Sequence, residues 1–324
     1  MRIFQKPTIF ISRCIEFDSC RYNGDMISSP EVRAMIDHVN FIHHCPEDKI
    51  GLGTPRDALR LVVIDGNNLL IQSNTELDVT EKMISYADKI ISQLPEMHGF
   101  ILKSRSPSCG IKDVKAYPRT GKVAMLHKKA KGIFAERVIE SFQNIPIEDE
   151  GRLRNLNLRE HFFRHIFTLA DFSEVKKKQK IRFLTEFHSR NKYLFMAYNQ
   201  KELKISGAIA ANHEKRPFDE VIDLYEQSLH RIFNRLPRIS TNINVAQHIF
   251  GYFSKFLSSK EKEYFLSELE RYIQRKIPLS TIMSLLKMWV VRFENPYLEQ
   301  QTYFEAFPEA LLNINTTGKG RLQK

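Results

Sequence analysis

Apolar residues in the first half of this 324-residue chain form short runs of strand length, separated by stretches in which they recur at every third or fourth position. Short apolar runs are typical of buried strands, and the wider spacing is typical of helices that pack along one face. Strands that alternate with helices predict an α/β domain with a Rossmann-like, largely parallel sheet. The expected strands lie at residues 7–13, 40–44, 61–64, 68–72 and 99–103, and the expected helices at 30–39, 79–94 and 132–142.

Local signals mark one turn and one helix start in this domain. The sequence Asp65-Gly66-Asn67 separates two apolar runs and predicts a hairpin. Asp78 and Glu81 have the spacing of a capping box, which predicts that a helix begins there. The dinucleotide fingerprint GxGxxG is absent from the sequence, and residues 51–55 are interpreted as a turn rather than a phosphate-binding loop.

The second half of the chain has helical periodicity throughout. Ser258 and Glu261 form a second capping-box pattern, and Pro237 and Pro278 lie at the expected joints between helices. This pattern predicts an all-α domain after the α/β domain. We expect an α/β domain over residues 1–145, a partly helical connector over residues 146–182, and an all-helical domain over residues 183–324.

Charge is distributed unevenly between the two halves. The net charge is +11, from 49 Lys and Arg against 38 Asp and Glu; residues 1–150 hold 20 of each sign, and residues 151–324 hold 29 against 18. Within the neutral half, residues 103–131 carry nine basic residues and one acid, Asp113. A basic stretch of this kind is compatible with an ordinary solvated surface, and equally with a polyanionic partner such as nucleic acid.

Targeting and disulfide signals are absent. The first apolar stretch, residues 8–12, is far too short for a signal-peptide core or a membrane span. Four cysteines in a chain of this length do not make a disulfide framework. We therefore expect a protein of the reducing cytoplasm that does not bind membranes.

Three of the four cysteines follow apolar runs that are far apart in sequence. Cys14, Cys45 and Cys109 each lie past the end of an expected strand. Side chains at the carboxyl ends of neighbouring parallel strands converge on one crevice, so three thiolates there would suit a metal or an iron–sulfur cluster with one open position. The close cysteine pairs of zinc ribbons and ferredoxins are absent, and scattered buried cysteines without a shared site remain an alternative.

A cysteine paired with a histidine would be a further possibility for chemistry. His43 and His44 directly precede Cys45. As adjacent residues in a strand, they are expected to point to opposite faces of the sheet, which does not favour a Cys–His pair.

Several blocks of the chain resemble known families. The first half is similar to the thiouracil desulfidase family, TudS, through ISRC at residues 11–14, CRYNG at 20–24, CPE at 45–47, GLGTPR at 51–56, DVT at 78–80 and FILKSRSPSCG at 100–110. The second half resembles the YbgA-type helical domain through NKY at residues 191–193, NVAQHIFGYF at 244–253 and IPL at 277–279. Together they resemble the fused tRNA 4-thiouridine desulfidases, called RudS. One departure is Glu16, where the family pattern has glycine.

The resemblance implies a 4Fe-4S cluster held by Cys14, Cys45 and Cys109, with one iron free to bind a thione sulfur. Cys20 lies in a polar turn and is interpreted as a neighbour of the cluster. The implied reaction removes sulfur from a thiolated uracil without net oxidation or reduction. It needs proton transfer, for which the resemblance implies Glu47 as acid and base and Ser106 as a second active-site residue.

Three hypotheses on function follow. The first is a desulfidase of 4-thiouridine in tRNA, with tRNA bound by the helical domain and by a basic loop. The second is a desulfidase of free thiouracil or its nucleoside, and the third is a non-catalytic iron–sulfur protein that binds RNA or acts as a sensor. A carboxyl group at residue 47 favours an enzyme, because a sensor has no need of it. The RNA-binding candidates are Lys103, Lys128, Lys129 and Lys131; the oligomeric state stays unknown.

Overall fold

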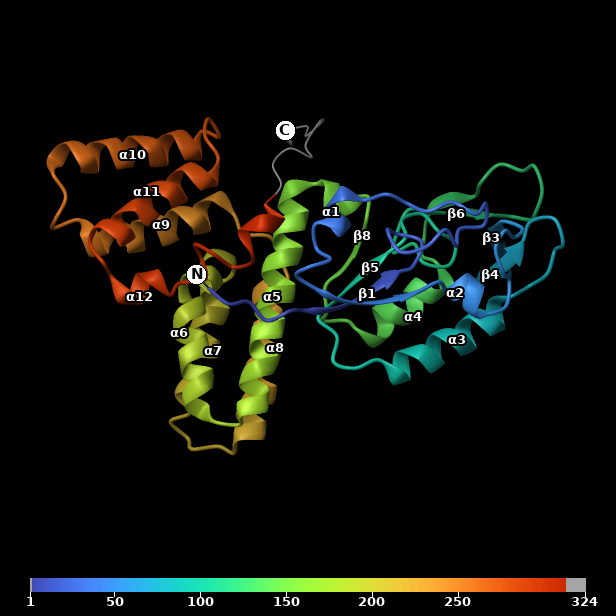
Figure 1. Ribbon diagram of the computed structural model, residues 1–324, viewed down its shortest axis with the longest axis horizontal. Coiled ribbons are helices and arrows are strands. Elements are labelled where there is room, and N and C mark those ends of the chain that lie inside the picture. The colour runs from blue at the N-terminus through green and yellow to red at the C-terminus, as the bar shows by residue number, and fades with distance from the viewer. Residues whose placement is uncertain (1, 313–324) are drawn as a thin grey trace. The chain divides into compact units, whose positions relative to one another are not determined.

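The computed structural model describes residues 2–312 and divides the chain into two compact units (Figure 1). The first unit comprises the residues up to Ala170 together with those from Phe307 onward, and the second comprises Asp171–Ala306. Residues 313–324 of the expected helical domain lie outside the described part. The expected connector, residues 146–182, contains a strand of the first unit and a long helix within which the division falls.

A four-stranded parallel sheet forms the centre of the first unit. Its strand order is β2-β1-β5-β8, and every neighbouring pair runs parallel. The prediction of a largely parallel α/β sheet is therefore confirmed. The strands are β1 (Thr8–Ser12), β2 (Asn40–His44), β5 (Gly99–Leu102) and β8 (Ile147–Asp149).

A second four-stranded sheet has the order β4-β3-β6-β7 and mixed strand directions. Its β3–β4 pair is antiparallel and forms the predicted hairpin, whereas β3 and β6 run parallel. The last two strands occupy the basic stretch that the sequence indicated only as a loop. The strands are β3 (Leu59–Ile64), β4 (Asn67–Gln72), β6 (Val114–Tyr117) and β7 (His127–Ala130).

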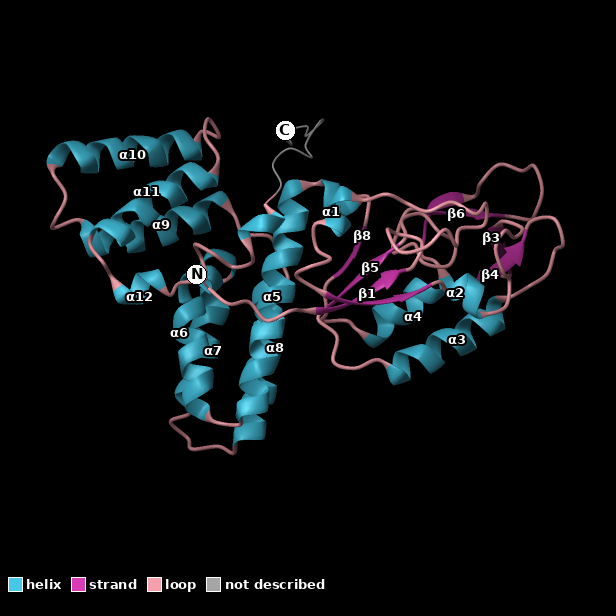
Figure 2. Cartoon of the chain, in the orientation of Figure 1, coloured by secondary structure: helices cyan, strands magenta, loops and turns pink. Residues whose placement is uncertain are grey.

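Helices α3 and α4 lie side by side along one face of the parallel sheet (Figure 2). Phe10 and Phe100 of the sheet, Met83 of α3 and Phe134 of α4 share one buried core with the inner face of the second sheet. The helices of this unit are α1 (Pro30–Arg33), α2 (Pro46–Lys49), α3 (Thr80–Gln93), α4 (Ile133–Ser141) and α5 (Leu156–Lys178), with a short 3₁₀ turn, η1 (Arg152–Arg154).

Gly99 lets the opposite face of the sheet approach α5 closely. A Cβ atom at this position would lie 2.9 Å from Ile166 Cγ2 and 3.2 Å from Phe162 Cζ. Since both residues are buried, a larger residue than glycine would force the helix away from β5. The first part of α5 therefore closes the second side of the parallel sheet.

Two local expectations are wrong. The helix expected at residues 30–39 ends at Arg33, because the next residues bond across turns, from Met35 N to Val32 O and from His38 N to Met35 O. The expected capping box at Asp78 is also absent, because the Asp78 carboxylate accepts from the amide of Thr80, two residues on, and α3 begins without a side-chain cap.

The second unit is all-helical, as the sequence predicts. Phe172, Phe187 and Tyr225 pack together in its interior, and the Ser258–Glu261 capping box is present at the start of α10. Among residues 2–312, no helix is both long and apolar enough to cross a lipid bilayer. The helices are α6 (Ile181–Tyr198), α7 (Gln200–Ala211), α8 (Phe218–Phe233), α9 (Ile239–Phe253), α10 (Ser259–Ile273), α11 (Leu279–Arg292) and α12 (Pro296–Glu299), followed by the 3₁₀ turn η2 (Glu309–Leu311) in the first unit.

Candidate functional site

The carboxyl ends of β1, β2 and β5 bring three cysteines to one edge of the parallel sheet. Cys14 lies two residues past β1, Cys45 follows β2 directly and caps α2, and Cys109 lies in the loop after β5. All four cysteines of the chain are buried, and none forms a disulfide. Three separate strand ends thus place these cysteines along one edge of the sheet.

Cys20 lies closer to the other thiols than a neighbouring residue of a polar turn would suggest. Its thiol hydrogen-bonds to the thiols of both Cys14 and Cys45, and the bond to Cys14 is the main cause that raises the pKa of Cys20 to about 11. The Cys45 thiol also donates to the Cys20 carbonyl oxygen, 3.7 Å away. The bond with Cys20, followed by burial, raises the pKa of Cys45. Three of the four thiols thus form one connected group.

The Cys109 thiol hydrogen-bonds to the side chain of Ser12, the last residue of β1. Burial raises the pKa of the Cys109 thiol, the hydrogen bond with the Ser12 side chain lowers it, and the charge of the Glu47 carboxylate raises it. Since the pKa values of Cys45 and Cys109 are raised, metal binding to these two thiols would have to release their protons. The assignment of Cys14, Cys45 and Cys109 as ligands, with Cys20 as a neighbour, stays a prediction.

The chemistry of these donors suits an iron–sulfur cluster. Within the part of the chain that the structure describes, no three His, Cys, Asp or Glu side chains converge on one point as ligands of one ion do. Cysteines that hold an iron–sulfur cluster bind different irons and need not converge on one point. Buried soft thiols with no disulfide among them are the donors such a cluster requires.

The N-terminus of α4 holds the loop that carries Cys109. The carbonyl oxygens of Pro107 and Ser108 accept from Ile133 N (3.1 Å) and Ala135 N (3.0 Å), two amides of the first helical turn. Gly132 permits this approach, because a Cβ there would lie 2.4 Å from the Ser108 carbonyl. The rigid helix thereby fixes where the Cys109 thiol lies.

Ser106 shapes the same loop from within. Its hydroxyl oxygen accepts from the backbone amides of Ser108 (3.2 Å) and Cys109 (3.1 Å). Such a turn is a common local use of serine. Its predicted part in the chemistry stays a prediction, since these contacts are with the loop backbone.

Glu47 joins the Cys45 helix to the Cys109 loop. One carboxylate oxygen, Oε2, accepts from Arg56 Nε (2.8 Å) and lies 2.7 Å from Arg56 Nη2. The other, Oε1, accepts from the Ser108 hydroxyl at 2.8 Å. The Ser108 side chain is fully buried, so this carboxylate is held on both oxygens beside two of the cysteines.

Arg56 organises this part of the site. Its side chain is 3% exposed, and Nη1 donates to the carbonyl oxygens of Cys20 (3.0 Å) and Gly53 (2.8 Å). Nη2 also lies 3.8 Å from Cys45 Sγ. Burial disfavours the charge of this guanidinium, but the Glu47 carboxylate more than offsets it and raises the pKa of Arg56. In the sequence analysis, Arg56 and Ser108 appear only as members of the GLGTPR and FILKSRSPSCG blocks, without a role.

Glu16 adopts the backbone conformation that glycine favours. Its φ of 66° lies in the left-handed region, which residues other than glycine rarely adopt. The carboxylate is bound by the Ser29 amide and by Arg33, whose Nε lies 3.1 Å from Oε2. These contacts explain how a glutamate keeps the loop after Cys14 in the shape that a glycine would give.

The two histidines before Cys45 point in different directions, as expected. The His43 ring stacks on Phe17 at 4.8 Å, whereas His44 hydrogen-bonds through Nδ1 to the Tyr86 hydroxyl at 2.9 Å. Burial lowers the pKa of His44. Each histidine thus has an aromatic partner of its own.

The four lysines predicted to contact RNA fall into two classes. The Lys103 ammonium lies 2.6 Å from Glu150 Oε1, so its charge is largely compensated within the protein. Lys128, Lys129 and Lys131, in or just after β7, are exposed. Only these last three present free positive charge to solvent, and their contact with RNA stays a prediction.

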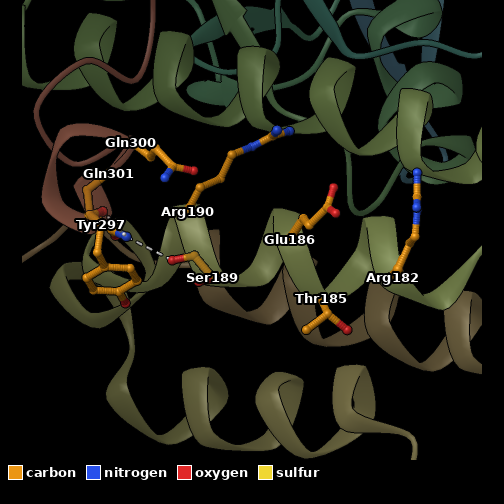
Figure 3. A pocket seen from close by; sticks show the side chains of 8 residues that line it. All are labelled: Arg182, Thr185, Glu186, Ser189, Arg190, Tyr297, Gln300 and Gln301. Atoms are coloured by element: carbon orange, nitrogen blue, oxygen red, sulfur yellow. Dashed lines mark hydrogen bonds between the residues drawn. The ribbon is translucent and has the colours of Figure 1, made fainter.

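The helical unit contains a cavity of about 530 Å³ between α6 and the segment that begins with α12 (Figure 3). Arg190 is tied to Asp171 at 3.0 Å, and the Gln301 side-chain amide donates to the Ser189 carbonyl at 2.9 Å. The residues that line this cavity include no cysteine or histidine. Its lining residues are Arg182, Thr185, Glu186, Ser189, Arg190, Tyr297, Gln300 and Gln301.

Two family models match the chain. The model described as 2-thiouracil desulfurase matches residues 9–150, which include all four cysteines and Glu47. The model described as a protein of unknown function, DUF1722, matches residues 192–308 in the helical unit. The two matches follow each other in the order that the sequence resemblance indicates.

Individual relatives agree with this division. The chain is 33% identical to the uncharacterized protein YbbK of Bacillus subtilis strain 168 over 110 residues, which is 32% of this chain and 72% of YbbK. It is 26% identical to the uncharacterized protein YbgA of Escherichia coli strain K12 over 155 residues, 47% of this chain and 91% of YbgA. Among solved structures, it is similar to the 4Fe-4S-dependent thiouracil desulfidase TudS, with 23% identity, 46% of this chain and 93% of that chain covered, and a TM-score of 0.36.

Proposed function

Because this chain belongs to the 2-thiouracil desulfurase family, we propose that it is a desulfidase that replaces the sulfur of a thiolated uracil with oxygen, and that its substrate is 4-thiouridine in tRNA. The observation that carries the proposal is the Glu47 carboxylate, held by Arg56 and Ser108 beside cysteines that come from three strand ends. A group that moves protons thus lies next to a set of soft metal ligands.

Cys14, Cys45 and Cys109 would hold a 4Fe-4S cluster, with Cys20 adjacent to it. When bound, such a cluster supplies an iron without a protein ligand, which acts as a Lewis acid toward a thione sulfur. The buried positions of the thiols would keep bulk water from the irons. Because cysteine binds iron as the thiolate, cluster binding would also release the protons of Cys45 and Cys109, whose pKa values are raised.

Glu47 performs the proton transfers that the exchange of sulfur for oxygen requires. Water adds to the thiocarbonyl carbon, and Glu47 accepts a proton from it as the carbon–oxygen bond forms. The carbon–sulfur bond then breaks, sulfur leaves as hydrosulfide, and the proton is returned from Glu47. One water is consumed and one hydrogen sulfide is formed, with no net oxidation or reduction.

Arg56 and Ser108 position this carboxylate. Arg56 binds only Oε2, and Ser108 donates only to Oε1, so the plane of the carboxylate is fixed before substrate arrives. A base fixed in this way loses little entropy when it meets the reacting water. Ser108 also lies one residue from Cys109, which couples the carboxylate to the loop of a proposed ligand.

The choice of tRNA as substrate rests on charge. The surplus of eleven positive charges resides in residues 151–324, and Lys128, Lys129 and Lys131 add exposed cations in the first unit. A small neutral base needs no such field, whereas a polynucleotide is bound through its phosphates. The base must also be turned outward from the folded tRNA to reach a buried site.

The test is an anaerobic assay of the purified, iron-loaded protein with tRNA that contains 4-thiouridine. We expect loss of the 4-thiouridine absorbance together with release of one sulfide per base converted, and a brown protein with about four irons per chain. Purified protein that is colourless and contains zinc would contradict the proposal. The absence of sulfide release with both tRNA and free thiouracil would also contradict it.

A further inference from the structure

Cys20 is a buried nucleophilic side chain to which the proposed reaction gives no task. It is 4% exposed, and its thiol contacts the thiols of Cys14 and Cys45. Thiols in contact are oxidised to a disulfide, which reductants reverse, whereas an isolated thiol is oxidised onward to acids that do not bind iron. The position of Cys20 therefore bears on what happens to the site when it meets an oxidant.

The turn between Cys14 and Cys20 is closed by contacts of its own. The Asp18 amide donates to the Arg13 carbonyl oxygen at 3.0 Å, and the Asp18 carboxylate lies 2.7 Å from Arg13 Nη2. Cys14 itself is anchored through its carbonyl oxygen, which accepts from the Ile27 amide at 2.7 Å. The chain thus reverses and brings Cys20 back to the cysteine six residues before it.

Cys20 is also held from outside the turn. Arg56 Nη1 donates to the Cys20 carbonyl oxygen at 3.0 Å, and the Cys45 thiol donates to the same oxygen at 3.7 Å. The Arg56 side chain is almost fully buried and also binds Glu47. All these contacts are made by the protein itself, so none of them depends on a bound metal.

Of its two neighbours, Cys14 is the better partner for a covalent bond with Cys20. Cys45 begins α2, and its thiol is directed at the Cys20 carbonyl and lies 3.8 Å from Arg56 Nη2. Cys14 and Cys20 belong to one turn, so their sulfur atoms can close to the disulfide distance of about 2.0 Å without moving a strand or a helix. Cys14 is also the most exposed of the four cysteines, at 9%, so a small oxidant reaches it first.

We propose that Cys20 is a resolving cysteine for Cys14, and that the two form a disulfide when the cluster-free protein meets hydrogen peroxide. The proposal rests on the proposed function, in which Cys14 is a cluster ligand, and adds a protective device to the same site. Peroxide transfers one oxygen to the Cys14 sulfur as the oxygen–oxygen bond breaks, which gives a sulfenic acid and one water. The Cys20 sulfur then attacks the Cys14 sulfur, the sulfur–oxygen bond breaks, and a second water leaves.

The disulfide preserves a ligand that would otherwise be lost. The two thiols together give up two electrons, and one peroxide is reduced to two waters. A dithiol restores both thiols by exchange, after which Cys14 is again free to bind iron. Without Cys20, a second peroxide converts the sulfenic acid of Cys14 to a sulfinic acid, which a dithiol does not reduce.

Peptide mapping tests the proposal directly. No Lys or Arg separates the two cysteines, so trypsin releases both in one peptide, residues 14–21. Full-length, anaerobically purified protein is treated with hydrogen peroxide and an iron chelator, alkylated and digested. We expect this peptide to be two hydrogens lighter than its reduced form and unlabelled, and cleavage after Glu16 to leave its two parts joined. A link from Cys20 to the peptide of residues 34–49, which carries Cys45, or a labelled Cys20 beside an oxidised Cys14, would overturn the proposal.

The variant Cys20→Ser removes the resolving thiol, and Ser19→Ala changes the exposed residue next to it as a control. After peroxide, all proteins receive dithiothreitol, iron and sulfide. We expect the wild type and Ser19→Ala to regain most of their iron, and Cys20→Ser to lose most of it and to carry a sulfinic acid on Cys14. Without peroxide, Cys20→Ser should bind as much iron as the wild type, which separates protection from a structural role.

Equal recovery of iron by Cys20→Ser and the wild type after peroxide would overturn the proposal. The peptide map of the wild type decides the pairing however the variant folds. Wild-type protein that forms the disulfide and regains its iron, but converts no thiouridine, would instead contradict the desulfidase function.

Discussion

The carboxyl edge of the parallel sheet and the outer face of the second sheet both carry cations, but they use them in opposite ways. At the edge, Arg56 is 3% exposed and paired with Glu47, and Lys103 is paired with Glu150. On the outer face, Arg60, Lys115 and Lys128 form no ion pairs with acids of the described chain. At the sheet edge the cations are neutralised by carboxylates of the protein. On the outer face the cations remain available to bind an anion.

The difference separates positioning from recognition. A buried, compensated pair fixes a reacting group and adds little to the long-range field, because its charges cancel. Exposed, unpaired cations attract a polyanion from a distance and respond to salt. Substitutions at the two regions should therefore differ in kind as well as in size.

The largest effect is expected at the cysteines. Replacing Cys14, Cys45 or Cys109 with alanine should abolish both iron binding and activity, whereas Cys20→Ala should keep most of its iron. The measurement is iron and sulfide content per chain together with the visible spectrum. Because Cys20 contacts two of the other thiols, loss of iron in Cys20→Ala with retention in one of the other three variants would show that our ligand set is wrong.

At the buried pair, Arg56→Lys should keep the positive charge but lose the two-nitrogen contact with Glu47. We expect kcat to fall roughly 10- to 100-fold, since small displacements of a catalytic group have effects of this size. KM for the thionucleoside and the iron content should change little. An unchanged kcat in a folded, iron-loaded Arg56→Lys variant would contradict the claim that the ion pair with Arg56 positions the Glu47 carboxylate.

The two serines of the Cys109 loop offer a matched pair. Ser108→Ala removes the hydroxyl that donates to Glu47. It should lower kcat by about tenfold, the effect expected from losing one hydrogen bond between a neutral donor and a charged acceptor. Ser106→Ala removes the acceptor for two loop amides, so its effect should fall on thermal stability and iron retention. The reverse assignment of effects would favour Ser106 as the active-site serine.

On the exposed side, neutralising Lys128, Lys129 and Lys131 together should weaken tRNA binding by about three- to tenfold at moderate salt and reduce the salt slope by about three. Binding is measured by titration across a salt series. The iron content should match the wild type, since these side chains point to solvent. Salt-independent tRNA binding by the wild type would contradict the role of exposed cations.

Structural elements that follow from a regular spacing of apolar residues could be predicted from the sequence. The parallel strands, the β3–β4 hairpin and the helices of the second unit follow from apolar spacing, and the convergence of Cys14, Cys45 and Cys109 follows from the rule that parallel strands end at one edge. Each of these needs only local sequence and one topological rule.

Contacts between loops that lie far apart in the chain could not be predicted from the sequence. Ser108 and Glu47 are 61 residues apart, and their hydrogen bond depends on how α4 supports one loop and α2 begins the other. Strands β6 and β7 have four residues each, and their outward lysines concealed the apolar alternation. Cys20 looked like part of a polar turn because nothing local indicates that the turn folds back on two thiols.

The most direct test of the account is the variant Glu47→Gln, which keeps the shape of the side chain but cannot exchange protons. We predict that it retains the brown colour and iron content of the wild type, while conversion of 4-thiouridine falls by about 10²- to 10⁴-fold in the anaerobic assay. Wild-type turnover by fully loaded Glu47→Gln would contradict the claim that the carboxylate held by Arg56 and Ser108 carries the chemistry.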